Sequence, residues 1–340
     1  MKTTETPTPS RRRSPIFWVP TAYFGMGLPF VVLNMVAVLM YKGLGVSDAE
    51  IAFWTSLIML PWTLKPLWSP LLEMYRTKKF FVVLTQMVSG VTFGLIALSL
   101  HLPSFFAVTI ALFAIVAFSG ATHDVACDGV YMDELNAQEQ AKYIGWQGAF
   151  YNVAKIIGTG LLVYLAGFLK DEYEGPAEDA VLYSWTVIMI ILGVVMFALG
   201  IYHTRMLPSG KHAHSVTSFS QSMAELWNVI RNFFTKKHIV YYLCFIILYR
   251  FAEGFVMKIV PLFLKAGRDV GGLGLTEQEI GIYYGTFGAA AFVLGSLLGG
   301  YYISARGLKK TLFSLCCVFN LPFMAYTLLA IFQPQSAPLI

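Results

Sequence analysis

Long runs of apolar residues, separated by short polar turns, make up most of this sequence. A helix needs about 20 mostly apolar residues to cross a membrane, and nine runs reach that length. The pattern therefore predicts an all-α polytopic membrane protein. The nine runs are residues 16–41, 49–72, 80–101, 104–132, 143–168, 181–204, 239–264, 278–303 and 311–332.

The composition agrees with this class, since 57% of the residues are hydrophobic, 13% are charged and the mean hydropathy is +0.64. Such values lie outside the usage of soluble globular domains. The first apolar run is long enough to span a membrane and is followed by others of its kind. We therefore expect it to remain as the first helix and not to be cleaved as a signal peptide.

Lysine and arginine are divided unevenly between the two ends of the predicted helices. With the N-terminus inside, most of the 24 basic residues fall on the inner face, and only Lys42, Lys170, Lys265 and Arg268 fall on the outer face. Because cytoplasmic loops are enriched in Lys and Arg, the sequence predicts a cytoplasmic N-terminus. The net charge of +5 thus reflects topology, and we expect no nucleic-acid partner.

The chain divides into two helical units joined by a polar segment. Residues 1–15 form a polar tail with an arginine cluster, residues 16–204 hold six predicted helices, and residues 239–340 begin a second unit with helices seven to nine. Residues 205–238 are basic, and their apolar positions recur at helical spacing. This spacing predicts an amphipathic helix on the cytoplasmic surface within a linker.

The two units share a local sequence pattern. Ser47 and Glu50 stand in the places of a helix capping box at the start of the second predicted helix. Thr276 and Glu279 repeat the pattern before the eighth predicted helix, and the exits of the same two helices are also alike. Two repeated local sequences at nearly the same separation indicate a duplicated unit.

Six charged residues fall deep inside the predicted helices. A charge at the middle of a membrane helix costs about 2.5–3.5 kcal/mol on insertion scales. Six unpaired charges would therefore cost about 15–20 kcal/mol, which exceeds the usual folding stability of about 5–15 kcal/mol. Pairing or hydration is required, so these residues are functional candidates. They are the cations Lys65, Lys155 and Arg250 and the anions Asp124, Asp128 and Glu253.

Asp124 and Asp128 lie four positions apart, on one face of the fourth predicted helix. Their like charges repel unless a cation intervenes, and Lys65 is the expected cation. Asp124 is deeper and could be either a proton site or a structural partner of Lys65. Asp128 lies nearer the cytoplasm, where it could bond Arg76 or backbone amides.

Two parallel six-helix units joined by a cytoplasmic linker are the plan of major facilitator superfamily transporters. The exit turn of the second predicted helix, which carries Glu73 and Arg76, resembles the superfamily's G-x-x-x-D-R-x-G-R-K loop. This resemblance implies a gating ion pair around Glu73. Because this turn and the end of the fourth predicted helix meet the same aqueous layer, we also expect Glu73, Arg76 and Asp128 to form a cytoplasmic charge cluster. The resemblance also implies twelve helices, so we expect helices 10 to 12 to be missing from this chain.

Residues 60–73, which read LPWTLKPLWSPLLE, resemble the LPYxxKFLWAPLxD signature of AmpG-type muropeptide permeases and their acetyl-CoA-transporter relatives. The resemblance extends from about residue 20 to residue 330. One departure is Lys155, which replaces an arginine that the family places one turn earlier, near Asn152. Further matches are Gly27-Leu28-Pro29, the pair Asp124 and Asp128, and Leu248-Tyr249-Arg250 with Glu253.

The resemblance implies a substrate and proton site in the membrane interior, shared by both units. Asp124 is the preferred proton site and Glu253 is its rival. Arg250 and Glu253 could instead only neutralise each other, and Lys155 could extend toward water. The expected site residues are Asn34, Lys65, Asp124, Asp128, Lys155, Tyr249, Arg250 and Glu253.

The leading hypothesis is a monomeric, proton-coupled importer of anhydro-muropeptides or related glycopeptides in the bacterial inner membrane, driven by the proton gradient without a cofactor. One alternative is a carrier of another organic solute, such as a sugar phosphate, a peptide or an acyl-CoA. Another is a non-transporting membrane sensor. An enzyme is not expected, because no nucleophile and base are suitably placed. His123, Cys127 and Asp128 do not complete a metal coordination shell.

Overall fold

All regular structure is helical in the residues that the computed structural model describes, which are 13–69, 72, 76–177, 179–209, 219–288, 308–321 and 323–335, with scattered positions between 290 and 306. Six described stretches are long and apolar enough to cross a membrane. The predicted all-α membrane architecture is therefore confirmed. The six are Pro15–Gly43, Lys78–Ser99, Phe105–Glu134, Ala137–Asp171, Ala180–Met206 and Lys309–Phe332.

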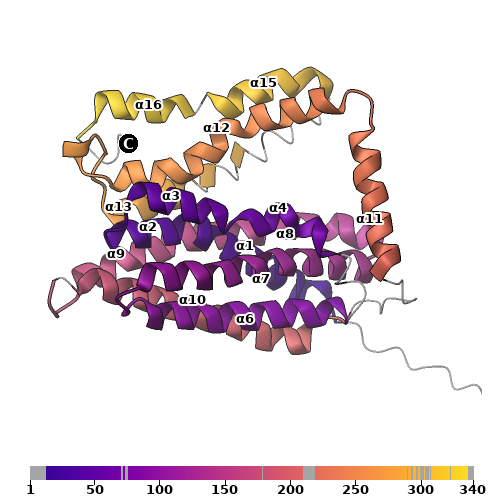
Figure 1. Ribbon diagram of the computed structural model, residues 1–340, viewed down its shortest axis with the longest axis horizontal. Helices are drawn as coiled ribbons and strands as arrows, with labels where there is room; N and C mark the ends of the chain where they lie inside the picture. Colours follow the sequence, from indigo (N-terminus) through magenta and orange to yellow (C-terminus); the bar gives the residue numbers. More distant parts are fainter. Residues whose placement is uncertain are drawn as a thin grey trace, which may run out of the picture.

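The helical elements follow the order of the predicted runs (Figure 1). They are η1 (Pro15–Phe17), α1 (Val19–Val31), η2 (Val32–Val36), α2 (Ala37–Gly43), α3 (Asp48–Leu57), α4 (Leu60–Leu64), η3 (Lys65–Leu67), α6 (Lys78–Ser99), α7 (Phe105–Glu134), α8 (Ala137–Ile156), η4 (Ile157–Leu162), α9 (Val163–Asp171), α10 (Ala180–Met206), α11 (Phe219–Phe234), α12 (Ile239–Lys265), η5 (Arg268–Val270), α13 (Glu277–Glu279), η6 (Ile280–Phe287), α15 (Leu308–Asn320) and α16 (Phe323–Phe332).

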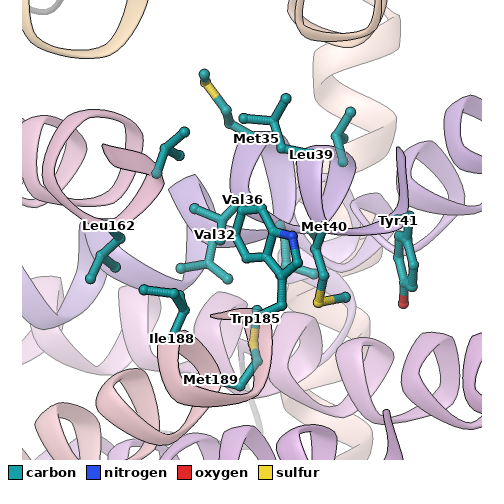
Figure 2. Close-up of a cluster of buried hydrophobic side chains, with 14 of the residues drawn as sticks. Val32, Met35, Val36, Leu39, Met40, Tyr41, Leu162, Trp185, Ile188 and Met189 are labelled. Atoms are coloured by element: carbon teal, nitrogen blue, oxygen red, sulfur yellow. The ribbon is translucent and has the colours of Figure 1, made fainter. Parts of the chain in front are cut away.

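The first half of the chain packs as one bundle around η2 and α2. Figure 2 shows Trp185 of α10 among Val32, Val36 and Met40, all of which belong to the buried apolar cluster. Trp185 is only 1% exposed. Since lipid tails are as apolar as these side chains, close packing rather than removal from water holds such membrane helices together.

The predicted second helix, residues 49–72, is not continuous. The structure divides it into α3, α4 and the short turn η3, with a break at Ile58 and Met59. Pro61 follows the break and Pro66 lies in η3; proline lacks the N–H that a continuous helix needs and its ring clashes with the preceding turn. The segment after Met59 is therefore not continuous with α3.

The predicted helix starts are present, with one difference. Thr276 and Glu279 form the complete capping box, in which the carboxylate of Glu279 accepts from the backbone N–H of Thr276. At the first start, the Ser47 hydroxyl accepts from the N–H of Glu50 but donates to the Glu50 carboxylate. Helix α11 lies in the stretch predicted to be amphipathic.

Helix α12 approaches the first half at one end only. In Figure 1 it lies close to α3 and α13 at one end and diverges from the first bundle toward α11. Val260 and Leu264 near its C-terminus are 4% and 3% exposed, whereas Val240 and Leu248 are 70% and 72% exposed. We call the closed end the outer end, after the prediction from the distribution of Lys and Arg that this end faces outside.

At the outer end, η4 of the first half lies against η6 of the second half with almost no side chain between them. A Cβ atom on Gly281 would lie 2.8 Å from the carbonyl oxygen of Gly160 and 2.8 Å from the backbone nitrogen of Tyr164. Both elements contain π-helical turns, which widen the helix locally. Glycine is therefore required for this approach of the two backbones.

Replacing Gly281 with Val should force η4 and η6 apart and destabilise the protein by about 1–3 kcal/mol, as overpacking does elsewhere. The measurement is the thermal unfolding midpoint in detergent. Gly148→Val is the matched control, because a Cβ atom on Gly148 would meet nothing within 4 Å. Equal midpoints for the two variants would contradict this close packing.

Candidate functional site

A buried ion pair joins η3 and α7. The Lys65 Nζ donates to Asp124 Oδ2 at 2.6 Å, as expected, and the indole Nε1 of Trp62 donates to the same oxygen at 3.0 Å. Asp124 is 9% exposed. Trp62 and Lys65 are three positions apart after the break in the second helix, so one face of this short segment presents both donors to α7.

Asp128, the second carboxylate on α7, has a different environment. Asp128 is exposed, and its Oδ1 accepts from the hydroxyl of Tyr23 at 2.8 Å. Gln147 in turn donates to the Tyr23 hydroxyl at 2.7 Å. Asp124 is thus the more buried of the two carboxylates, as the sequence predicts, and the two acids do not share one partner set.

The expected cytoplasmic gate is only partly visible. The guanidinium of Arg76 lies over the ring of Phe80, 5.6 Å from its centroid, and Asp128 is bonded to Tyr23. A direct Arg76–Asp128 bond is therefore not among the contacts of these two described residues, and that expected contact is wrong for this conformation. Glu73 lies outside the described residues.

The three expected site residues of the second half, Tyr249, Arg250 and Glu253, all lie on α12. Glu253 is half-buried on α12, and Arg250 belongs to the same helix, although its side chain lies outside the description. The ring of Tyr249 packs between Phe245 and Phe319, with centroid distances of 5.9 and 4.9 Å. Tyr249 therefore contributes to helix packing here and does not line the cavity described below.

Lys258 on α12 contacts the first half through its ammonium group. Its Nζ donates to the backbone carbonyl oxygen of Thr55 on α3 at 3.3 Å. This bond spans the two halves near the outer end. The ammonium is retained inside the protein because a carbonyl that the helix leaves accessible can accept from it.

A cavity of about 290 Å³, lined mostly by apolar residues with a few polar groups among them, lies between the two halves. Asn34 and Lys155, both expected substrate contacts, line it. Asn34 donates to the Phe30 carbonyl oxygen at 2.9 Å, and the Lys155 Nζ lies 5.2 Å from the ring centroid of Tyr151. The lining residues are Phe30, Val31, Asn34, Met35, Lys155, Thr159, Met257, Tyr284, Gly285, Gly288 and Tyr326.

Three polar residues of this cavity and one donor to Asp124 were not predicted from the sequence. Thr159 could have been found, because it lies four positions after Lys155 on the same helix face. Tyr284 and Tyr326 have no such marker, since tyrosine in membrane helices is common in packing. Trp62 stands at the tyrosine position of the LPYxxKF signature, and this position was the available clue.

A second charge cluster closes the outer end. Glu277 at the start of α13 is 5% exposed and accepts from Lys265 at 2.6 Å and from Lys170 at 3.0 Å. Burial alone would raise the pKa of Glu277, but the two ammonium groups lower it to about 2. Lys170 belongs to the first half, and Lys265 and Glu277 belong to the second, so the cluster ties the halves together.

These features define a class of protein. It is a multi-pass helical membrane protein with two halves, a cavity between them that holds a few polar groups, and buried charges nearby, which is the construction of a transporter. The family model of the Major Facilitator Superfamily matches residues 21–340. The chain belongs to this superfamily.

Curated relatives of the chain include proteins with AmpG names. An uncharacterized protein of Haemophilus influenzae is 24% identical over 85% of this chain and 64% of its own length. The anhydromuropeptide permease of Escherichia coli is 25% identical over 76% of this chain and 49% of its own length. The putative transporter AmpG 4 of Rickettsia conorii is 23% identical over 84% and 67%. The chain spans about half to two thirds of these relatives.

A solved structure shares the fold. It is a bacterial homologue of the human lysosomal transporter Spinster, in an inward-facing and unoccupied conformation. The TM-score is 0.64 at 16% identity, over 89% of this chain and 64% of that one. A second structure of the homologue, inward-facing and occupied, gives a TM-score of 0.60.

Lys65→Met should destabilise the protein by about 3 kcal/mol, because it leaves the buried Asp124 carboxylate without its cation. Asp124→Asn in the same chain should restore much of the loss, since no bare charge then remains. The measurement is the unfolding midpoint of the two variants in detergent. Lys42→Met, which breaks the more exposed Lys42–Asp48 pair, should change stability by less than about 1 kcal/mol. An equal loss in both single variants would contradict the role of burial.

Proposed function

We propose that this chain forms a proton-coupled transporter that imports anhydromuropeptides or related glycopeptides across the bacterial inner membrane by alternating access. The observation that carries the proposal is the buried Lys65–Asp124 pair beside a cavity that both halves line. A carboxylate inside a membrane marks a proton or substrate pathway more often than a purely structural site. In this proposal the transporter acts as a monomer and needs no cofactor besides the proton gradient.

The proposed substrate follows from the relatives and from the cavity. The E. coli relative is named an anhydromuropeptide permease. Such a ligand has sugar rings and peptide carboxylates, and the cavity offers Lys155 for an anionic group and Asn34, Thr159 and Tyr284 for hydroxyl and amide groups. A site with few, well-placed polar groups among apolar residues is typical of small-molecule binding.

Coupling requires a group whose protonation differs between the two access states. Asp124 on α7 is suited to this role because its cation, Lys65, belongs to another element, η3, which follows the break in the second predicted helix. While Lys65 stays within 2.6 Å, the carboxylate form is stabilised. Movement of η3 away from α7 would leave a buried carboxylate that takes up a proton instead.

Alternating access also requires a breakable contact at the outer end. The pKa of Glu277, held near 2 by Lys265 and Lys170 against the opposing effect of burial, lies far below any physiological pH. The cluster therefore stays ionised on both sides of a proton gradient, and opening has to separate the ions rather than neutralise them. We therefore propose Glu277 for gating and Asp124 for proton coupling.

Asp124→Asn should abolish gradient-driven accumulation of anhydromuropeptide in proteoliposomes and leave exchange across the membrane partly intact, because Asn imitates the protonated acid. Glu253→Gln is the matched comparison on α12. If Asp124→Asn still accumulates substrate and Glu253→Gln cannot, the proton is carried by α12. Uptake of another solute in place of anhydromuropeptide would identify a different carrier. Binding without uptake would identify a sensor.

Glu277→Gln should open the outer end, because a neutral amide cannot hold two ammonium groups. A cysteine placed at Tyr284, in a chain without its native cysteines, should then react at least several-fold faster with a membrane-impermeant maleimide added from outside. Asp48→Asn is the control, since it breaks an ion pair at the same end but within one half. Equal labelling rates in the two variants would exclude the cluster as a gate.

A further inference from the structure

Three aromatic rings from three helices connect the buried ion pair with the cavity. The ring of Phe30 on α1 meets the indole of Trp62 on α4 edge to face, with centroids 5.5 Å apart and an interplanar angle of 77°. The same ring lies 6.5 Å from the ring of Tyr151 on α8. Lys155 approaches the Tyr151 ring at 5.2 Å, and both Phe30 and Lys155 line the cavity.

One end of this path is a donor to Asp124. Both groups that bond Asp124 Oδ2, the indole N–H of Trp62 and the ammonium of Lys65, can only donate. Both therefore stabilise the carboxylate and neither can accept a proton from the acid. The other oxygen, Oδ1, is buried without a hydrogen-bond partner in the structure. A proton on Oδ2 would displace a donor, whereas a proton on Oδ1 would displace none.

The position of the indole is fixed by the helix that carries Asp124. A Cβ atom on Gly120 of α7 would lie 2.9 Å from Cζ2 and 3.1 Å from Cη2 of Trp62. The six-membered part of the indole therefore rests against the α7 backbone one turn before Asp124, and Phe30 contacts the indole from α1. Because the indole cannot move toward α7, a shift of Phe30 has to move the indole N–H of Trp62 relative to Asp124 Oδ2.

We propose that Trp62 and Phe30 are positioning residues that couple occupancy of the cavity to protonation of Asp124. The proposal rests on the proposed function, since it explains how a substrate in the cavity reaches the proton site. It assigns to Trp62 the bond to the acid and to Phe30 the mechanical link to Tyr151 and Lys155.

The steps follow from the contacts. An anionic group of the substrate draws the Lys155 ammonium away from the Tyr151 ring, so the packing of Tyr151 on Phe30 changes. The indole then turns, and its N–H leaves Oδ2. The carboxylate has lost one of two donors, so Oδ1 binds a proton delivered by a hydronium ion, which leaves as water, while Lys65 remains an ammonium. By linkage, protonation of Asp124 strengthens substrate binding by the same factor.

A neighbouring tryptophan provides a control. Trp68 donates from its indole to the Thr122 hydroxyl on the same helix α7 at 3.2 Å and packs on Phe118 at 4.6 Å. Among the described residues, its indole bonds Thr122 and neither Asp124 nor Asp128, and Trp68 does not line the cavity between the halves. Trp68→Phe therefore removes an equivalent indole and N–H without touching the proposed path.

The first experiment needs no substrate. Infrared difference spectroscopy of the full chain in liposomes follows the carboxylic-acid C=O band that Asp124→Asn removes, as a function of pH. Trp62→Phe should move the midpoint of this band upward by about one pH unit, because a donor to the carboxylate is lost. Trp62→Tyr should restore part of the shift, and Trp68→Phe should leave the midpoint unchanged. Equal shifts in Trp62→Phe and Trp68→Phe, or none in either, would overturn the assignment.

The second experiment tests the link to the cavity by a double-mutant cycle on the same band. Lys155→Met should move the midpoint in the native background both through the lost charge and through the aromatic path. In a Phe30→Leu background only the direct effect of the charge remains, so the shift should be smaller by at least half a pH unit. Equal shifts in both backgrounds would show that Phe30 transmits nothing.

Neither spectroscopic experiment measures transport, so the two proposals fail separately. If the wild-type chain takes up no anhydromuropeptide but the cycle shows coupling, the proposed substrate is wrong and the positioning role stands. If the wild type accumulates the substrate and the cycle shows no coupling, the proposed substrate stands and the positioning role is wrong. Retained unfolding midpoints for Phe30→Leu and Trp62→Phe exclude misfolding as the cause of either result.

Discussion

The Lys65–Asp124 ion pair is the interaction on which the arrangement of the first half depends. A charged group inside a membrane has no water to stabilise it, so its partner must be brought within bonding distance by the fold. Two features accomplish this in the described residues. The break before Pro61 separates the Trp62–Lys65 segment from α3, and both donors of this segment reach Asp124 on α7. Gly120 leaves room for the indole beside the acid. Elsewhere in the half, apolar packing around Trp185 provides the rigid support for this segment.

The two halves meet through contacts of two physical kinds at the outer end. Backbone approaches backbone at Gly160 and Gly281, a contact that is short-ranged and depends on shape. Beside it, Glu277 is held by lysines of both halves, a contact that acts over a longer distance and resists protonation. The cavity with Lys155 and Asn34 lies on the inner side of this closure and is reached by the aromatic residues that connect to Asp124.

Much of this structure could be predicted from the sequence, because hydrophobic length and charge placement are local properties. The spans, the capping box at Thr276 and the partnership of Lys65 with Asp124 were predicted. The broken second helix was not, although two prolines marked it, since prolines are tolerated in membrane helices. The Glu277 cluster could not be foreseen, because Lys170 lies far from it in sequence and only the packing of the halves joins them. The packing of Tyr249 against Phe319 depends on tertiary structure in the same way.

The partners of Lys170 show how the outer end could open without exposing a bare charge. Its Nζ lies 3.0 Å from Glu277 and 4.0 Å from Asp171, its neighbour in the first half, which in turn accepts from Gln278 of the second half. When the halves separate, Lys170 can pass to Asp171 while Glu277 keeps Lys265. Opening thus becomes an exchange of partners between neighbouring ions. In the proposed transport cycle, such an exchange would leave each ion of the cluster beside an oppositely charged neighbour in the open state as well.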